Sequence, residues 1–448
     1  MLERWLTRLF NIEHDEIEPV AAGFVLFFLL FAGYFMLRPM RETMGITGGV
    51  DNLQWLFTGT FVATLAAMPL FGWVAARVRR RRILYWVFGF FSANLVGFAL
   101  GFLAQPDNVW LARAFYIWLS VFNMIAISLA WSVLVDLFAV DQAKRLFGLM
   151  VAGASLGGLT GPILGVLLVG PIGHAGLLFL SAALLVAAAV SARRVQHWRD
   201  AHPGQDSAAE GRAISPSPSG RRWREATDEG VSVAAPSPSR NQPLGGSPFA
   251  GATEVLRSPY MIGIAVFVLL LASVTTFLYF EQARLVELAF PDKTDQTRVF
   301  GTIDATVQGI AILSQLFITG RIAKRLGIGV LLVAVPVVVV FGFLWLALAP
   351  TFAVLAIVMV TRRAGEYAFV RPGREMLWTA VAPQAKYKAK NFVDTVVYRG
   401  ADAVSAWVKA GVDLLAQQPA IAAVLGAAIA LLWAFNGAVL ARMHRRMT

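Results

Sequence analysis

One nine-residue pattern occurs twice in the sequence, and it combines residue types that bind anions. In each copy a tyrosine is followed four residues later by an Arg-Pro pair, and then by an Arg-Glu pair. The copies are Tyr34, Arg38, Pro39, Arg41, Glu42 and Tyr367, Arg371, Pro372, Arg374, Glu375. Residues three and four apart share a helix face, so each copy presents two guanidiniums beside a carboxylate. The glutamate can neutralise one arginine and leave the other for a two-point grip on phosphate or carboxylate.

Each copy lies in a long apolar stretch, where ionisable groups are costly and usually functional. We therefore expect both copies to act as gates or substrate contacts. The alternative is that they form structural salt bridges at helix ends. The two stretches should cross the membrane in opposite directions, which places the copies toward opposite faces, as in inverted repeats. The proline in each copy removes a backbone donor and frees a carbonyl toward the cavity.

Further ionisable residues at membrane depth are expected to belong to the same site. These are Glu281, Arg284, Asp394 and Arg399. The polar residues Asp304, Gln308, Arg362, Arg363, Glu366 and Asp402 also lie at this depth. The number of arginines favours an anionic substrate, whose charge the protein must match after water is removed. Glu281 and Asp394 could instead carry protons, because a carboxylate in an apolar cavity can bind one, and the sequence leaves both interpretations open.

The composition is that of a membrane protein. Of the 448 residues, 57% are hydrophobic and only 15% are charged. The chain has 0 cysteines, which excludes disulfides and thiolate chemistry, and its five histidines show no metal-ligand spacing. We therefore expect neither a metal nor a cofactor. The net charge of +12 is explained by basic loops rather than by binding to nucleic acid.

Twelve apolar stretches are long enough to cross a bilayer as helices, which predicts an all-α integral membrane protein with two six-helix halves. The first six lie near 19–45, 52–76, 83–103, 109–135, 146–169 and 174–192. The other six lie near 258–286, 299–320, 328–349, 352–378, 391–415 and 419–441. The predicted domains are an N-terminal segment 1–18 containing an interfacial helix, the halves 19–194 and 251–441, a disordered Ser/Pro-rich linker 195–250, and a tail 442–448.

Basic residues predict which loops face the cytoplasm, because cytoplasmic loops carry an excess of lysine and arginine. The basic loops contain Arg77, Arg79 to Arg82, Lys144, Arg145, Arg321, Lys324, Arg325, Lys386, Lys388 and Lys390. The connections on the other side are short and nearly uncharged. Both termini and the linker should therefore be cytoplasmic, in a multi-pass protein of the inner (plasma) membrane.

The two halves share further short matches. Gln142-Ala143-Lys144 after the fourth stretch recurs as Gln384-Ala385-Lys386 after the tenth. Two halves of six spans joined by a long loop resemble the major facilitator superfamily, whose halves rock around a central site. The fifth stretch resembles the glycine-rich motif of antiporters in that superfamily, through Gly148, Gly157, Gly161, Pro162 and Gly165. These small residues can equally serve close helix packing in lipid.

Two segments resemble the ATP/ADP translocases of plastids and obligate intracellular bacteria, together with their relatives in free-living bacteria. Residues 34–42 are similar to that family's first-span pattern, Leu-Arg-Asp followed by Thr-Lys-Asp. Residues 367–399 are similar to its signature around the tenth span, with Arg374-Glu375-Met376 in place of Lys-Glu-Met. By this resemblance Arg41 and Arg374 contact the phosphates of ATP or ADP, and Glu42 and Glu375 are their acidic neighbours.

The chain departs from the translocase pattern at two places. Leu129-Ala130-Trp131 stands where the family has Glu-Leu-Trp, and Asp402 stands where a lysine is expected. A carrier of other phosphate-bearing or carboxylate metabolites on the same scaffold would fit the remaining arginines equally well.

The expected function is secondary transport of an anionic, phosphate-bearing solute by alternating access and exchange. The expected partners are the lipid bilayer and this small anion, and the expected state is a monomer. The sequence lacks a Gly-x-x-x-x-Gly-Lys-Ser/Thr loop, which argues against an ATP-driven pump, and it offers no acid, base and metal set for an enzyme. Two alternatives stay open: a proton-coupled carrier of carboxylate metabolites, and a non-transporting sensor or scaffold.

Overall fold

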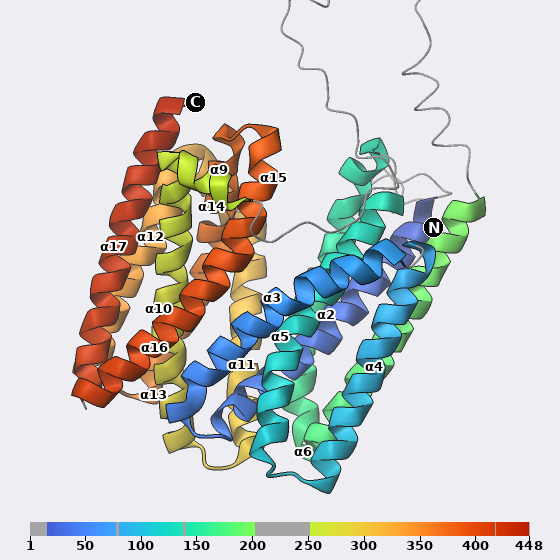
Figure 1. Cartoon of the computed structure of the whole chain (residues 1–448), viewed down its shortest axis with the longest axis horizontal. Coiled ribbons are helices and arrows are strands. Elements are labelled where there is room, and N and C mark those ends of the chain that lie inside the picture. The colour runs from blue at the N-terminus through green and yellow to red at the C-terminus, as the bar shows by residue number, and fades with distance from the viewer. Residues whose placement is uncertain (1–15, 78–79, 138–139, 202–250, 417, 448) are drawn as a thin grey trace, which may run out of the picture.

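The chain folds as two bundles of helices that lie side by side (Figure 1). The computed structural model describes residues 16–77, 80–137, 140–201, 251–416 and 418–447, and every regular element among them is a helix. The all-helical fold predicted from the sequence is confirmed. The expected interfacial helix near the N-terminus and most of the expected linker lie outside the described residues.

The N-terminal half consists of five continuous elements and one short turn. They are α2 (Ile17–Ile46), η2 (Val50–Asn52), α3 (Leu53–Arg77), α4 (Arg80–Ala104), α5 (Val109–Leu137) and α6 (Val140–Ala201). The long α6 is two helices, because Gly173 breaks it with φ 69° and ψ 179°. A positive φ of this size suits glycine, which has no Cβ to clash with the backbone. The sequence predicted two stretches here, near 146–169 and 174–192.

The first part of α6 runs parallel to α2 in very close contact. A Cβ atom added at Gly153 would overlap the backbone oxygen of Phe24, and one added at Gly157 would overlap that of Phe28. Residue numbers therefore increase in the same direction along both helices at this contact. Glycine at these positions is required for the backbones to approach, which is the packing explanation of the glycine-rich motif.

The second part of α6 runs in the opposite direction along α2. Ser181 Oγ donates to the carbonyl oxygen of Gly33 at 3.2 Å, and Ser191 Oγ donates to that of Ala22 at 2.8 Å. Residues with higher numbers in this part of α6 therefore contact residues with lower numbers in α2. The chain therefore reverses at Gly173, and the two parts of α6 are antiparallel helices.

The C-terminal half repeats this plan with more interruptions. Its α-helices are α9 (Ala252–Arg257), α10 (Pro259–Ala289), α11 (Lys293–Ser314), α12 (Gly320–Leu348), α13 (Phe352–Gly365), α14 (Arg371–Leu377), α15 (Pro383–Phe392), α16 (Tyr398–Ala416) and α17 (Pro419–Met447). Gly327, with φ 72°, breaks α12 as Gly173 breaks α6. The 3₁₀ turn η5 (Trp378–Ala380) follows α14.

Three π-helical turns interrupt otherwise continuous helices of this half. They are η3 (Gln315–Thr319) between α11 and α12, η4 (Glu366–Val370) between α13 and α14, and η6 (Val393–Val397) between α15 and α16. A π turn widens the helix by one residue and is frequent at functional sites. The sequence did not predict these turns.

Nine helical segments among the described residues are long and apolar enough to cross a membrane. One of them, Leu146–Trp198, contains the reversal at Gly173. The polar, interrupted runs α13–α14 and α15–α16 are not among the nine. The count of twelve crossings therefore stays a prediction.

Two domain limits differ from those expected. The linker was expected from residue 195, but α6 continues to Ala201 because Val195 and Trp198 are buried. The tail was expected from residue 442, but α17 continues to Met447 and buries His444, whose Nδ1 lies 2.9 Å from the hydroxyl of Tyr260. The remaining domain limits stay predictions.

Each half has its own apolar core, and a third small core joins them. This joining core contains Leu53 and Leu56 of α3 packed with Phe280 of α10 and Ala406 of α16. We call the end of the bundle where α17 finishes the terminal face, and the other end the opposite face. In Figure 1 the halves diverge toward the terminal face.

Candidate functional site

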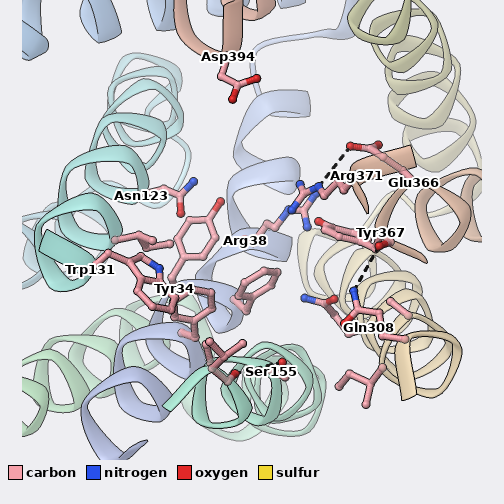
Figure 2. Close-up of a pocket in the computed structure, with 18 of the residues that line it drawn as sticks. Tyr34, Arg38, Asn123, Trp131, Ser155, Gln308, Glu366, Tyr367, Arg371 and Asp394 are labelled. Carbon is pink, nitrogen blue, oxygen red and sulfur yellow. Dashed lines mark hydrogen bonds and ion pairs between the residues drawn. The ribbon is translucent and has the colours of Figure 1, made fainter. Parts of the chain in front are cut away.

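A cavity of about 700 Å³ lies between the two halves. Its N-terminal wall is formed by α2, α5 and α6, and its C-terminal wall by α11, η3, η4, α14, η6 and α16. The N-terminal wall presents Tyr34, Asn123, Trp131 and Ser155 (Figure 2). Aromatic rings with a few amide and hydroxyl groups can contact a planar, weakly polar part of a solute.

The C-terminal wall carries most of the charge. Glu366, Tyr367, Arg371, Arg374 and Asp394 line it. Arg38 reaches across from α2 toward Arg371 (Figure 2). Arg38 and Arg371 both point into the space between the halves, near enough for their charges to interact. Two like charges held together in a cavity favour an anion between them.

The ion pairs around the cavity contain more arginines than carboxylates. Among the residues that the structure describes, seven arginines take part: Arg38, Arg41, Arg362, Arg363, Arg371, Arg374 and Arg399. Five carboxylates face them: Glu42, Asp304, Glu366, Asp394 and Asp402. If all are ionised, two positive charges are left over.

The distances identify the two surplus arginines. Asp304 pairs with Arg363 at 2.6 Å and with Arg38 at only 3.7 Å. Glu366 pairs with Arg362 at 3.1 Å and with Arg371 at only 3.8 Å. Arg362 and Arg363 are buried and make the shorter contacts, whereas the side chain of Arg371 is 53% exposed and that of Arg38 is 24% exposed. Arg38 and Arg371 are therefore the arginines free to bind a ligand.

The two copies of the repeated pattern meet at one end and separate at the other. Tyr34 and Arg38 line the same cavity as Tyr367 and Arg371. Glu42, at the far end of the first copy, is instead buried. We expected the two copies to lie toward opposite faces of the membrane. Their Tyr-Arg ends instead lie together, because the pattern begins near the middle of both helices.

The glutamate of the second Arg-Glu pair is more exposed than the glutamate of the first. Glu375 is 53% exposed and accepts a hydrogen bond from Lys390 Nζ at 2.6 Å. Arg374 lines the cavity, 3.5 Å from Asp394. Arg41, in the first copy, is instead held by Glu42 at 3.0 Å and by the carbonyl oxygen of Tyr116 at 3.2 Å.

A smaller chamber of about 150 Å³ lies beside the central cavity. Arg38, Arg41, Tyr398 and Arg399 line both spaces, so they separate one from the other. The small chamber also contains Glu42, Asp402, two tyrosines and three threonines. Every residue that lines it, apart from Phe57, carries a polar group.

The second copy begins in the π turn η4, and the side chain of a glutamine donates the hydrogen bond that its proline cannot donate. Arg371 N–H bonds to the carbonyl oxygen of Glu366, five residues earlier. The next residue, Pro372, has no N–H, so the carbonyl of Tyr367 loses its donor. Gln315 Nε2 donates to this carbonyl instead, at 3.3 Å. The π turn η3, which contains Gln315, is thereby tied to the π turn that holds Arg371.

Glu281 and Arg284 lie away from the central cavity. They form an ion pair at 2.6 Å and line a third cavity of about 800 Å³, which includes residues 49–51 between α2 and α3. The buried Lys409 lies 2.9 Å from Glu281 and 2.5 Å from Asp413. Of the other expected site residues, Asp394 and Arg399 line the central cavity.

Sequence reasoning missed several cavity residues. Asn123, Ser155, Gln315 and Tyr398 line the cavity, and the buried Lys409 was overlooked. An available signal was their polarity within apolar stretches. That signal does not distinguish a side chain that faces the cavity from one that bonds to its own helix.

Comparisons with known proteins identify the family of the chain. A sequence profile described as Major Facilitator Superfamily matches residues 20–388. A curated relative, "ADP,ATP carrier protein 1" of Chlamydia trachomatis, is 21% identical over an alignment of 454 positions that covers 87% of this chain and 81% of the relative.

Solved structures of transporters share the fold. The nucleoside transporter NupG (D323A mutant) superposes with a TM-score of 0.60 at 15% identity, over 96% of this chain and 99% of that one. A POT family transporter in complex with a thioalcohol-conjugated peptide gives 0.63 at 10% identity, over 98% and 99%. The resemblance inferred from the repeated halves is confirmed: this chain belongs to the major facilitator superfamily.

Proposed function

We propose that this protein is a secondary transporter that moves an anionic, phosphate-bearing solute, such as a nucleotide, by alternating access and exchange. The observation that carries the proposal is the pair of surplus arginines, Arg38 from the N-terminal half and Arg371 from the C-terminal half. An anion between them contacts both halves at once, so its binding favours conformations in which the halves approach.

Guanidinium geometry supports phosphate as the recognised group. A guanidinium offers parallel N–H donors that match two oxygens of a phosphate. Arg371 is also held over the ring of Tyr367, 4.2 Å from its centre, which orients the guanidinium before a ligand arrives.

The opposite wall supports a solute that has a planar part. Tyr34 and Trp131 line it beside the amide of Asn123. A nucleotide, with a base at one end and phosphates at the other, matches a cavity that is aromatic on one side and cationic on the other. The relatives named ADP,ATP carrier protein 1 support the same class. Leu129, where the translocase pattern has an acid, is buried and does not line the cavity.

We assign the terminal face to the cytoplasmic side of the inner membrane, because loops rich in lysine and arginine are typical of that side. In this assignment the present conformation is open to the cytoplasm and closed at the opposite face by the joining core. We take the monomer as the transporting unit, since the cavity is formed by one chain.

The test is uptake of labelled ATP into proteoliposomes that contain the purified protein, with and without ADP inside. The proposal predicts saturable uptake that requires internal ADP and is lost in Arg38→Gln and Arg371→Gln. Arg442→Gln is the control, because Arg442 is exposed near the end of α17 and outside the cavity. Uptake that is equal in empty and ADP-loaded vesicles would exclude exchange, and no uptake would exclude ATP.

A further inference from the structure

The amide oxygen of Asn123 lacks a hydrogen bond, although Asn123 lines the N-terminal wall of the central cavity. Asn123 lies on α5, and it shares the helix face that lines the cavity with Ser120, Ile127 and Trp131, at spacings of three and four residues. Its buried Oδ1 has no hydrogen-bond partner among the described residues. A buried amide oxygen normally has a donor, so an unsatisfied one in a cavity wall is a candidate ligand contact.

The serine hydroxyls of the same wall are already hydrogen-bonded. Ser120 Oγ donates to the carbonyl oxygen of Tyr116 at 3.2 Å on α5, and Ser155 Oγ donates to that of Val151 at 3.2 Å on α6. Both serines therefore bond to their own helices, as serine commonly does inside a helix. The amide of Asn123 instead keeps its oxygen as an acceptor for a ligand, beside an NH₂ group that can donate.

Aromatic rings line the wall around this amide. Phe31 and Tyr34 come from α2, and Trp131 comes from α5. Figure 2 shows the Tyr34 ring and the Asn123 amide on the same side of the cavity, across from Arg371. A flat ring bound against this wall therefore meets aromatic faces on which it can stack, and an amide that can hydrogen-bond to its edge.

The donor and acceptor of an asparagine amide match one edge of adenine. Adenine presents the N6 amino group as a donor beside N7 as an acceptor, and asparagine can form two parallel hydrogen bonds with this edge. The corresponding edge of guanine presents two acceptors, O6 and N7, and would leave Asn123 Oδ1 without a donor. A pyrimidine has a smaller ring, so it covers less of the aromatic wall than a purine does.

We propose that Asn123 determines base specificity by selecting adenine as the base of the bound nucleotide. The Asn123 amide binds the adenine edge through two hydrogen bonds, while Arg38 and Arg371 bind the phosphates. The selection rests on the proposed function, because it requires a nucleotide in the central cavity. It adds a property that the arginines do not provide, since guanidiniums bind the phosphates of every nucleotide alike.

Calorimetric titration of the purified protein with ATP, GTP and CTP compares three bases that carry the same phosphates. The native protein should bind ATP about tenfold more tightly than GTP or CTP. Asn123→Ala should lose this preference by weakening the binding of ATP about tenfold, with little effect on GTP. Asn123→Asp replaces the amide donor by a second acceptor, which suits the N1–H and N2 amino donors of guanine, so this variant should bind GTP more tightly than ATP.

Asn94→Asp is the matched control, because the Asn94 amide bonds to the carbonyl oxygen of Phe90 on α4, outside the cavity lining. It should leave all three affinities unchanged, and thermal melting checks that each variant is folded. Equal binding of the three nucleotides by the native protein would overturn the assignment of Asn123 and leave nucleotide transport standing. A preference for ATP that survives in Asn123→Ala would do the same, even if Asn123→Asp does not fold. A native protein that binds none of the three would overturn both the proposed function and this assignment.

Discussion

Replacing Arg371 by glutamine should weaken anion binding far more than it weakens the fold. Arg371 lies 3.8 Å from Glu366, whose nearer partner is Arg362, so removal of Arg371 leaves no buried carboxylate unpaired. A charge-assisted hydrogen bond contributes about 1.5–3 kcal/mol, and a two-point grip therefore contributes about 3 kcal/mol at the lower end of that range. Because 1.4 kcal/mol corresponds to a tenfold change, the expected loss is roughly 100-fold in Kd.

The assay is calorimetric titration of ATP into the purified protein. Arg371→Lys keeps the charge but not the planar fork, so it should lie between the native protein and Arg371→Gln. Thermal melting of the Arg371→Gln protein should stay close to that of the native protein. Unchanged affinity in Arg371→Gln would refute the assignment of Arg371 as a surplus, ligand-binding arginine.

Two further predictions concern stability. Lys409→Met leaves Glu281 buried with Arg284 as its remaining cation. The free energy of unfolding should therefore fall by about 3 kcal/mol, the lower end for breaking a buried ion pair, and the melting temperature should fall with it. An unchanged melting temperature would contradict this prediction. Gly157→Ala places a Cβ against the α2 backbone and should cost about 1–3 kcal/mol, whereas Gly148→Ala, which meets nothing within 4 Å, should not. Equal melting temperatures of these two variants would contradict the claim that the α2 backbone leaves no room for a Cβ atom at position 157.

Much of the fold could be predicted because membrane crossings have a simple sequence signal. The stretch expected near 258–286 is α10, Pro259–Ala289, and the stretch expected near 419–441 lies within α17, Pro419–Met447. The π turns could not be predicted, because they depend on partners elsewhere in the chain. The turn that ends at Val370 needs a replacement donor for Tyr367, and Gln315 provides it from another helix.

The candidate site was predicted as a set of residues but not as a set of pairs. The repeated spacing identified Arg38 and Arg371 as candidates. It could not show that Asp304 is taken by Arg363, which lies 59 positions later in the sequence, at 2.6 Å. Spacing instead suggested that the glutamate of each copy neutralises one of the two arginines of that copy. Which arginine is left free is decided by contacts between helices, and these are fixed only in the folded protein.

The most direct test of the account is a structure determined by electron cryo-microscopy in the presence of ATP. The account predicts density for a phosphate group within hydrogen-bond distance of both Arg38 and Arg371, with the base against the wall that contains Trp131. ATP bound only in the cavity beside Lys409, or an unoccupied central cavity at saturating ATP, would contradict the claim that guanidiniums from the two halves hold one anion.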